Sequence, residues 1–386
     1  MTKRRQAKKG QSKKTPELPP PDKYVVWIAL ALSAVGVIAV YSAIAFLAET
    51  KAGGNTEQFL LRHLVYVGLA LGAMVLFSRI DYRVLVRFGR ISLIIMTLLL
   101  LLVQFIGIQS GGAVRALDLG FIMFQPAELA KVALLLYVAF LLTKKQAYIE
   151  SFSRAFTPLF VWIILTVVLI GIEDLSTASL VFGATVMMCF VARVHVLQLS
   201  GLGAVCLLLA TIFLLSSPAR MARLDEYLGR GEPTAEEVNQ IPQGDGYQAY
   251  QAKIAFAMGG LTGKGPGKST QRDFLPAPYN DFIFAIIAEE YGLWGALGLL
   301  ALFSILLIRG FMSIARRAPD PLGLILAVGI TTLVCLYGFV HAAVTCGLLP
   351  VTGLPMPFVS YGGTSLLANG VLLGILLNIS RHALRE

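Results

Sequence analysis

The sequence predicts an all-α polytopic membrane protein with about ten transmembrane helices and a long extracytoplasmic loop between helices 7 and 8. Of its 386 residues, 56% are hydrophobic and only 14% are charged, whereas soluble domains carry about 25% charged residues. Apolar runs recur along the chain, and several approach the length of about 20 residues that a membrane-spanning helix needs. Lys and Arg gather in every second connection between these runs, as expected for a multi-pass topology.

Each apolar run is predicted to be one span. The runs cover residues 25–48, 59–79, 91–108, 122–143, 156–173, 176–192, 196–215, 282–308, 322–346 and 358–379. The first run is too long for the core of a signal peptide and lacks a clear small-residue cleavage site, so it is predicted to be a retained anchor.

The placement of basic residues predicts that both ends of the chain lie in the cytoplasm. Eight of the first 24 residues are Lys or Arg, which indicates a basic tail facing anionic lipid and argues against nucleic acid as the partner. The predicted organisation is therefore a tail (1–24), helices 1–7 (25–215), an extracytoplasmic loop (216–281), helices 8–10 (282–380) and a second tail (381–386) in the inner membrane.

The four Cys and four His residues are scattered and show no paired spacing. The sequence therefore predicts neither a disulfide framework nor a metal site. The long loop is different, because an ordered connection of this length is usually functional. We therefore expect the protein to carry out its function at the extracytoplasmic face of the membrane.

A glycine-rich segment, Gly259–Ser269, lies in this loop. It lacks the first Gly of a phosphate-binding P-loop, since Thr262 stands there, and no strand precedes it, so ATP binding is rejected. Its backbone N–H groups, with Lys264 and Lys268, could still form an anion-binding nest. The alternative is a flexible turn.

Charged residues also fall inside predicted spans. Glu128 and Lys131 are three apart and share one helical face, where they form either an internal ion pair or a polar wall of a cavity. Asp281 stands where the long loop enters span 8, as a helix N-cap or as a general base. Glu289 and Glu290 lie about two turns further along the same span. Two adjacent carboxylates there need cations or water, which predicts an open polar cavity.

A proline-rich turn, residues 347–358, precedes the last span. Four hydroxyl-bearing residues follow it, which either serve tight helix packing or line the cavity. They are Ser360, Tyr361, Thr364 and Ser365.

At these motifs the sequence resembles the SEDS family (shape, elongation, division, sporulation), the FtsW/RodA/SpoVE peptidoglycan polymerases. The resemblance extends from span 1 to Arg381, and its strongest segments occur in family order and spacing. These segments are 124–131, 259–269, 275–292 and 347–365. The sequence departs from the family pattern at Ser176, Ala116 and His341. The long basic tail and the 280–292 segment favour the division type, FtsW, over the elongation type, RodA.

The resemblance implies a glycosyltransferase that polymerises lipid II, an undecaprenyl-pyrophosphate disaccharide-pentapeptide. Asp281 matches the essential aspartate of the family and would deprotonate the acceptor 4-hydroxyl. Glu128 and Lys131 match a pair beside the central cavity. Lys264, Lys268 and Arg115 would offset charge on the pyrophosphate, a task that a divalent cation (Mg or Mn) could share. The implied partners are a class B penicillin-binding protein transpeptidase and other division proteins.

Two further functions fit a ten-span bundle with intramembrane charge, a lipid II flippase and an inactive scaffold for division proteins. A flippase needs polar groups through both leaflets, whereas the charges placed here gather in the outer half. This distribution, together with the intact Asp281, favours the enzyme.

Overall fold

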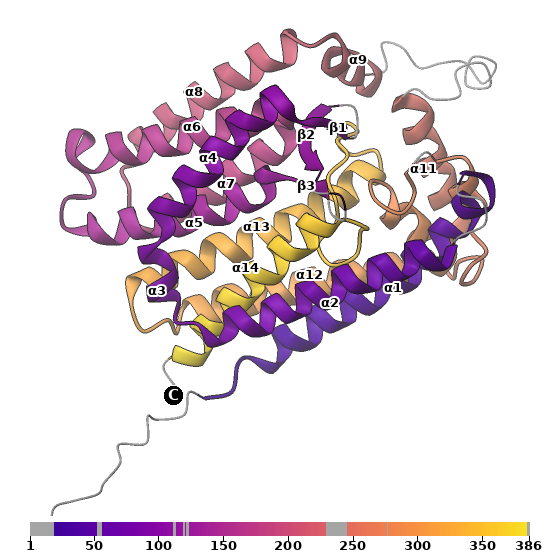
Figure 1. Ribbon diagram of the computed structural model, residues 1–386, viewed down its shortest axis with the longest axis horizontal. Helices are drawn as coiled ribbons and strands as arrows, with labels where there is room; N and C mark the ends of the chain where they lie inside the picture. Colours follow the sequence, from indigo (N-terminus) through magenta and orange to yellow (C-terminus); the bar gives the residue numbers. More distant parts are fainter. Residues whose placement is uncertain are drawn as a thin grey trace, which may run out of the picture.

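The computed structural model describes residues 19–51, 56–110, 113–118, 120, 123–228, 245–275 and 277–383. Long helices dominate it, and they run side by side along one axis (Figure 1). They are α1 (Lys23–Lys51), α2 (Thr56–Arg79), α4 (Gly89–Ile106), α5 (Pro126–Lys144), α6 (Thr157–Glu173), α7 (Leu175–Val191), α8 (Val196–Leu215), α12 (Ile283–Ile308), α13 (Pro321–Thr345) and α14 (Gly363–His382).

Within the described residues, nine helices are long and apolar enough to cross a membrane, and α7 is a shorter apolar helix. At 1.5 Å per residue, the 17 residues of α7 span about 25 Å, slightly less than the hydrocarbon core of about 30 Å. The all-α multi-pass prediction is confirmed. The basic residues before residue 19 lie outside the described residues, so the cytoplasmic tail stays a prediction.

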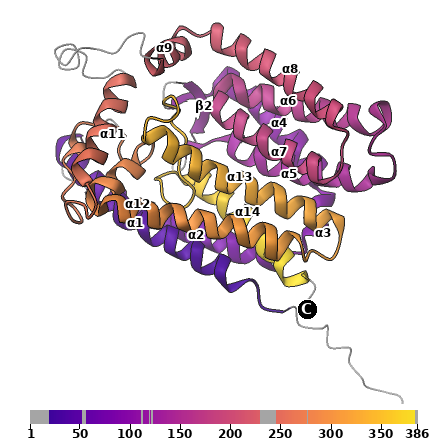
Figure 2. The ribbon, with the colours of Figure 1, turned by 180° about the vertical axis from the view of Figure 1, so that it is seen from behind.

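Shorter elements lie at the two ends of the bundle. Figures 1 and 2 place α3 and the C-terminus at one end and the strands, α9 and α11 at the other. These elements are α3 (Tyr82–Arg87), α9 (Pro218–Tyr227), α11 (Asp245–Gly259), the 3₁₀ helices Gln146–Tyr148 and Gln271–Asp273, and the π-helical turns Phe152–Phe156 and Arg309–Ala315. Residues 216–281, predicted as one long loop, therefore contain two α-helices and a 3₁₀ helix within their described part.

Two predicted spans start too early. Span 4 was expected from residue 122, but β3 (Met123–Phe124) pairs with β2 (Ala113–Asp118), which also pairs with β1 (Ile108–Ser110) in a small antiparallel sheet. The helix then begins at Pro126, whose fixed φ suits the first helical position. Span 10 was expected from residue 358 but begins at Gly363, because Phe358 has φ +63° and cannot continue a helix.

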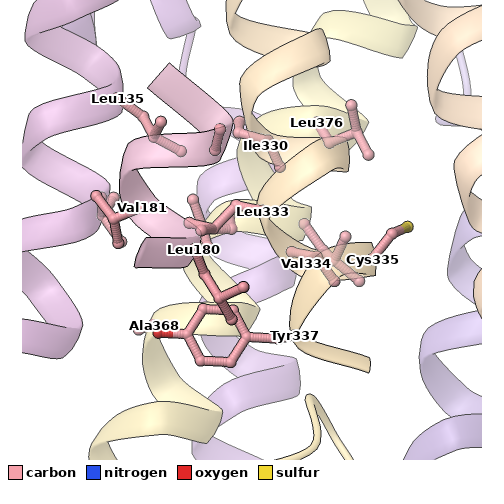
Figure 3. Close-up of a cluster of buried hydrophobic side chains, with 14 of the residues drawn as sticks. Leu135, Leu180, Val181, Ile330, Leu333, Val334, Cys335, Tyr337, Ala368 and Leu376 are labelled. Carbon is pink, nitrogen blue, oxygen red and sulfur yellow. The ribbon is translucent and has the colours of Figure 1, made fainter. Parts of the chain in front are cut away.

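The core lies where α5, α7, α13 and α14 meet. Figure 3 shows Leu135 of α5, Val181 of α7, Leu333 and Tyr337 of α13 and Leu376 of α14 in this cluster. Helix association in a membrane depends on close packing rather than on release of water. These four helices therefore form the rigid support for the elements at their ends.

Helices α2 and α14 approach each other through two glycines. A Cβ on Gly370 would lie 2.2 Å from the Ala70 carbonyl oxygen, and one on Gly374 would lie 2.7 Å from that of Met74. Glycines four residues apart form a smooth strip along one helix face, which allows this approach. The contact fixes α2 against the middle of α14.

Asp320 ties together the end of the bundle that carries α3. It caps α13 by accepting a hydrogen bond from Gly323 N at 2.7 Å, and its other oxygen accepts one from the Tyr82 hydroxyl at 2.8 Å. Arg83 Nη2 lies 2.7 Å from the same oxygen. Burial alone raises the pKa of Asp320, but these bonds outweigh it and hold the pKa below its ordinary value of 3.8.

We expect Asp320→Asn to lower the thermal unfolding midpoint at pH 7. A carboxyl whose pKa is lowered by folding contributes stability above its unfolded pKa and loses this contribution as the pH falls through its folded pKa. The variant should therefore approach the parent in stability below about pH 4. Thermal unfolding in detergent at both pH values measures this, and equal midpoints at pH 7 would contradict the assignment.

Candidate functional site

A polar cavity of about 520 Å³ opens at the end of the bundle that carries the strands. Its walls come from α2, β2, α5, the α6–α7 junction, the segment before α12 and the turn before α14. Five residues predicted as site residues line it: Arg115, Glu128, Tyr361, Thr364 and Ser365. Polar groups far apart in the sequence thus meet in one space.

Glu128 and Lys131 form an ion pair on α5. Lys131 Nζ lies 2.7 Å from Glu128 Oε2, as their spacing of three residues predicts. Lys131 is fully buried behind Glu128 and lies 4.1 Å from the centre of the Tyr337 ring. Glu128 lines the cavity, whereas Lys131 does not. The pair combines both predicted alternatives, because it is an internal ion pair with one member in the cavity wall.

A second ion pair joins β2 to the start of α7. Arg115 Nη1 lies 3.7 Å from Asp174 Oδ2, and Asp174 caps α7 through Ser176 N and Thr177 N. The Thr177 hydroxyl donates to Asp174 at 2.9 Å and accepts from the Tyr337 hydroxyl at 3.3 Å. Tyr337 therefore links the two ion pairs of the cavity into one network.

Asp281 lies beside the cavity, in the turn before α12. The N-cap position of α12 is Phe282, so the carboxylate of Asp281 does not cap this helix. Its neighbour Asn280 lines the cavity, and so does Gly353, where an added Cβ would lie 3.4 Å from Asp281 Oδ2. Gly353 has φ +63°, which favours glycine and brings the backbone close to the carboxylate.

The turn before α14 holds the segment that carries Asp281. The Ser360 hydroxyl donates to the Asn280 carbonyl at 2.8 Å and accepts from Met356 N at 2.8 Å. Tyr361 N donates to the Tyr279 carbonyl at 3.0 Å. Burial and the nearby charge of Asp281 raise the pKa of Tyr279. Ser360 is thus a support of the site rather than part of its lining.

Thr364 and Ser365 begin α14 in the cavity wall. The Thr364 hydroxyl donates to the Met123 carbonyl at 2.9 Å and accepts from Gln125 N at 3.3 Å. It therefore connects α14 with β3 and with the start of α5. These residues serve helix packing and cavity lining together.

The glycine-rich segment is not an open anion nest. Lys264 N and Gly265 N donate to the carbonyls of Glu289 and Glu290, at 3.0 and 2.9 Å, so these donors already have partners. Lys264 Nζ lies 2.6 Å from Glu289 Oε1. Neither Lys264 nor Lys268 lines the cavity. The predicted contact of these lysines with a pyrophosphate therefore finds no support in the geometry.

The predicted open cavity around Glu289 and Glu290 is also wrong. Glu289 is fully buried, and its carboxylate accepts hydrogen bonds from the Ser269 and Thr270 hydroxyls at 2.5 and 2.9 Å and from the backbone N–H groups of Thr270 and Gln271. Glu290 accepts from the Ser42 hydroxyl. Protein hydrogen-bond donors surround these carboxylates, in place of the water of the predicted cavity. The carboxylates thereby fasten the glycine-rich segment to α12.

We expect Glu289→Gln to destabilise the protein by about 1–3 kcal/mol, since several hydrogen bonds to a buried charge weaken together. The matched control is Glu150→Gln, which makes the same chemical change at an exposed position. Thermal unfolding in detergent, with limited proteolysis of the 259–271 segment, compares the two. An unfolding midpoint equal to that of the control would contradict this role of Glu289.

Sequence reasoning missed the contribution of α2 to the cavity. Phe59, Arg62 and Tyr66 all line it. Their spacing of three and four residues places them on one helical face. An arginine in the outer part of a predicted span also indicates a polar cavity or a binding site there. It also missed Glu173, a buried cavity residue whose Oε1 accepts from Gln104 Nε2 at 3.3 Å.

The comparisons with known proteins agree with the motif pattern. The FTSW_RODA_SPOVE family model, described as "Cell cycle protein", matches residues 23–385. The chain belongs to this family. The resemblance of the motifs to the FtsW/RodA/SpoVE proteins is therefore confirmed.

Two curated relatives match nearly the full chain. The probable peptidoglycan glycosyltransferase FtsW of Geobacter metallireducens is 37% identical over 364 residues, covering 93% of this chain and 94% of the relative. Stage V sporulation protein E of Bacillus subtilis is 36% identical over 367 residues, covering 94% and 98%. The similarity thus includes both the bundle and the long connection before α12.

Two solved structures share the fold. One, described as "Structural coordination of polymerization and crosslinking by a peptidoglycan synthase complex", superposes with a TM-score of 0.73 at 28% identity and covers 94% of this chain and 98% of that chain. The crystal structure of Thermus thermophilus rod shape determining protein RodA superposes with a TM-score of 0.68 at 26% identity, covering 95% and 98%. The multi-pass helical architecture is therefore that of the FtsW/RodA/SpoVE family.

Proposed function

We propose that this chain is a peptidoglycan glycosyltransferase that polymerises lipid II into glycan strands on the outer face of the cytoplasmic membrane during cell division. One observation carries the proposal. Asp281, which caps no helix, is held beside a polar cavity at one end of a membrane-spanning bundle. The relatives named peptidoglycan glycosyltransferase FtsW supply the reaction class.

In the proposed reaction Asp281 is the general base. Its carboxylate takes the proton of the acceptor 4-hydroxyl, and the sugar oxygen attacks the anomeric carbon of the lipid-linked chain. The bond from that carbon to the pyrophosphate oxygen breaks, and undecaprenyl pyrophosphate leaves with the bonding electrons. Positioning of both sugars in the cavity would supply most of the remaining rate enhancement.

Arg115 and the Glu128–Lys131 pair have supporting roles in this proposal. Arg115 borders the cavity with its charge partly offset by Asp174, so it can orient polar groups of the substrate and stabilise developing negative charge. Glu128 can accept hydrogen bonds from sugar hydroxyls, while the ion pair with the buried Lys131 holds its carboxylate in the cavity wall.

A dedicated metal site does not fit the residues near Asp281. Among the described residues, no three His, Cys, Asp or Glu side chains converge in a way that could hold a cation. In the proposed reaction, residues of this chain therefore carry the proton transfer and the charge stabilisation.

The cavity lies at one end of the bundle, which suits a polymerase better than a flippase. A flippase needs a polar path through both leaflets, whereas the opposite end is fastened by Asp320 and its partners. We propose that the cavity end faces outward and that both termini lie in the cytoplasm. This follows the placement of basic residues in the connections at the α3 end.

We also propose a partner, a class B penicillin-binding protein transpeptidase, within a larger set of division proteins. The structurally similar peptidoglycan synthase complex is described as coordinating polymerization and crosslinking. Division rather than elongation is proposed because named FtsW relatives reach 37% identity, whereas the RodA structure reaches 26%.

The test is incubation of the purified chain with labelled lipid II, with and without the class B partner, followed by gel analysis of glycan length. We expect glycan strands that grow with time. If no strands form in either case, while the chain moves lipid II between the leaflets of vesicles, the enzyme assignment fails and the flippase stands.

A further inference from the structure

Most cations at or near the cavity have their own carboxylate. Arg115 lies 3.7 Å from Asp174, Lys131 lies 2.7 Å from Glu128, and outside the lining Lys264 lies 2.6 Å from Glu289. Arg62 is different. Within the part of the chain that the structure describes, no carboxylate lies within 4.0 Å of its guanidinium, although Arg62 lines the cavity.

The other acidic side chains of the cavity have neutral partners. Asp118 accepts a hydrogen bond from Gly120 N at 2.7 Å, and Glu173 accepts one from Gln104 at 3.3 Å. Neither lies within ion-pair distance of Arg62 in the described structure. The positive charge of Arg62 is thus available to an anion that enters the cavity.

Tyr361 holds the Arg62 side chain in place. Its hydroxyl accepts a hydrogen bond from Arg62, and burial raises the pKa of this hydroxyl to about 12, so it remains an uncharged acceptor at neutral pH. The Tyr361 ring stacks on the buried His63 ring at 5.4 Å and meets Tyr66 and Tyr279 edge-on at 6.0 and 5.6 Å. Three rings therefore fix the tyrosine that orients the guanidinium.

The same tyrosine connects Arg62 with the proposed base. Tyr361 N donates to the Tyr279 carbonyl at 3.0 Å, two residues before Asp281, and the adjacent Ser360 holds Asn280. Arg62 and Asp281 are thus tied to one turn, residues 353–361. A cation in a fixed relation to the base is suited to a leaving group in a fixed relation to the attacking hydroxyl.

We infer that Arg62 binds the pyrophosphate of the lipid-linked substrate and that Tyr361 is the residue that positions its guanidinium. This inference rests on the proposed function and adds a binding residue to it. A guanidinium presents five donors in a planar fork that matches phosphate oxygens in pairs. The bond to Tyr361 uses one of these five donors, so a guanidinium held in this way can still present the fork to a phosphate.

The test measures binding of geranylgeranyl pyrophosphate and of the corresponding alcohol to the full chain in detergent, by isothermal titration calorimetry. We expect Arg62→Gln to weaken binding of the pyrophosphate about tenfold or more, which equals about 1.4 kcal/mol. Arg62→Lys should weaken it less, because the charge is kept. Tyr361→Phe should weaken it about threefold, because the rings remain and only the positioning hydroxyl is lost.

The matched control is Arg79→Gln, which makes the same change at the far end of α2, outside the cavity lining. It should bind both ligands as the parent does, and all variants should bind the alcohol equally. Equal pyrophosphate binding by the parent and Arg62→Gln, no binding by the parent, or an equal loss for the alcohol would each overturn the inference. Polymerisation of lipid II by the parent is measured separately, so the proposed function can stand when this inference fails.

Discussion

Replacing Asp281 by Asn should reduce glycan polymerisation by about 10³-fold or more. The amide has nearly the same shape as the carboxylate, so its packing against Gly353 is kept, but it cannot take a proton from a sugar hydroxyl. General base catalysis contributes about 10²–10⁴-fold to a rate. Because the side-chain volume is also kept, we expect the substitution to leave the fold intact.

The measurement is gel analysis of glycan made from labelled lipid II, together with the thermal unfolding midpoint. Asp273→Asn is the matched control, since it removes an exposed carboxylate from the same connection. We expect the control to polymerise as the parent does. Polymerisation at the parent rate by Asp281→Asn would remove the base from the mechanism. A large fall in its unfolding midpoint would instead assign Asp281 a structural role.

The helical architecture could be predicted from the sequence because the bilayer fixes the length and apolarity of each span. Eight of the ten predicted spans agree with a helix to within three residues at both ends. In the other two cases the helix begins later than predicted, for local reasons. Strand pairing keeps Met123 out of α5, and the left-handed backbone at Phe358 interrupts the apolar run before α14. Neither feature follows from hydropathy.

The contacts between site residues could be predicted only where the two partners are close in the chain. Glu128 and Lys131 were paired correctly because three residues on a helix define one face. The Lys264–Glu289 pair joins residues 25 positions apart, and no spacing rule connects a loop to the inside of a later helix. The contact between Arg62 and Tyr361 was missed for the same reason, since only the fold brings the two residues together.

The Glu128–Lys131 pair should show strong coupling in a double-mutant cycle. Lys131→Ala leaves the buried Glu128 carboxylate without its ion-pair partner. Removing one partner of a buried ion pair in this way lowers the stability of a protein by about 3–5 kcal/mol. Adding Glu128→Ala removes the stranded charge. The double variant should therefore be more stable than Lys131→Ala alone, with the packing of Lys131 against Tyr337 still lost.

Stability and polymerisation are measured on the parent, the two single variants and the double variant. Together these measurements separate a structural role of the pair from contact with substrate. If the pair only supports the fold, both quantities should recover together in the double variant, because the unpaired buried charge is gone. If Glu128 also contacts substrate from the wall, stability should recover while polymerisation stays low. A double variant less stable than Lys131→Ala would contradict the buried ion pair as the source of the effect, since removing an unpaired buried charge should not destabilise the protein further.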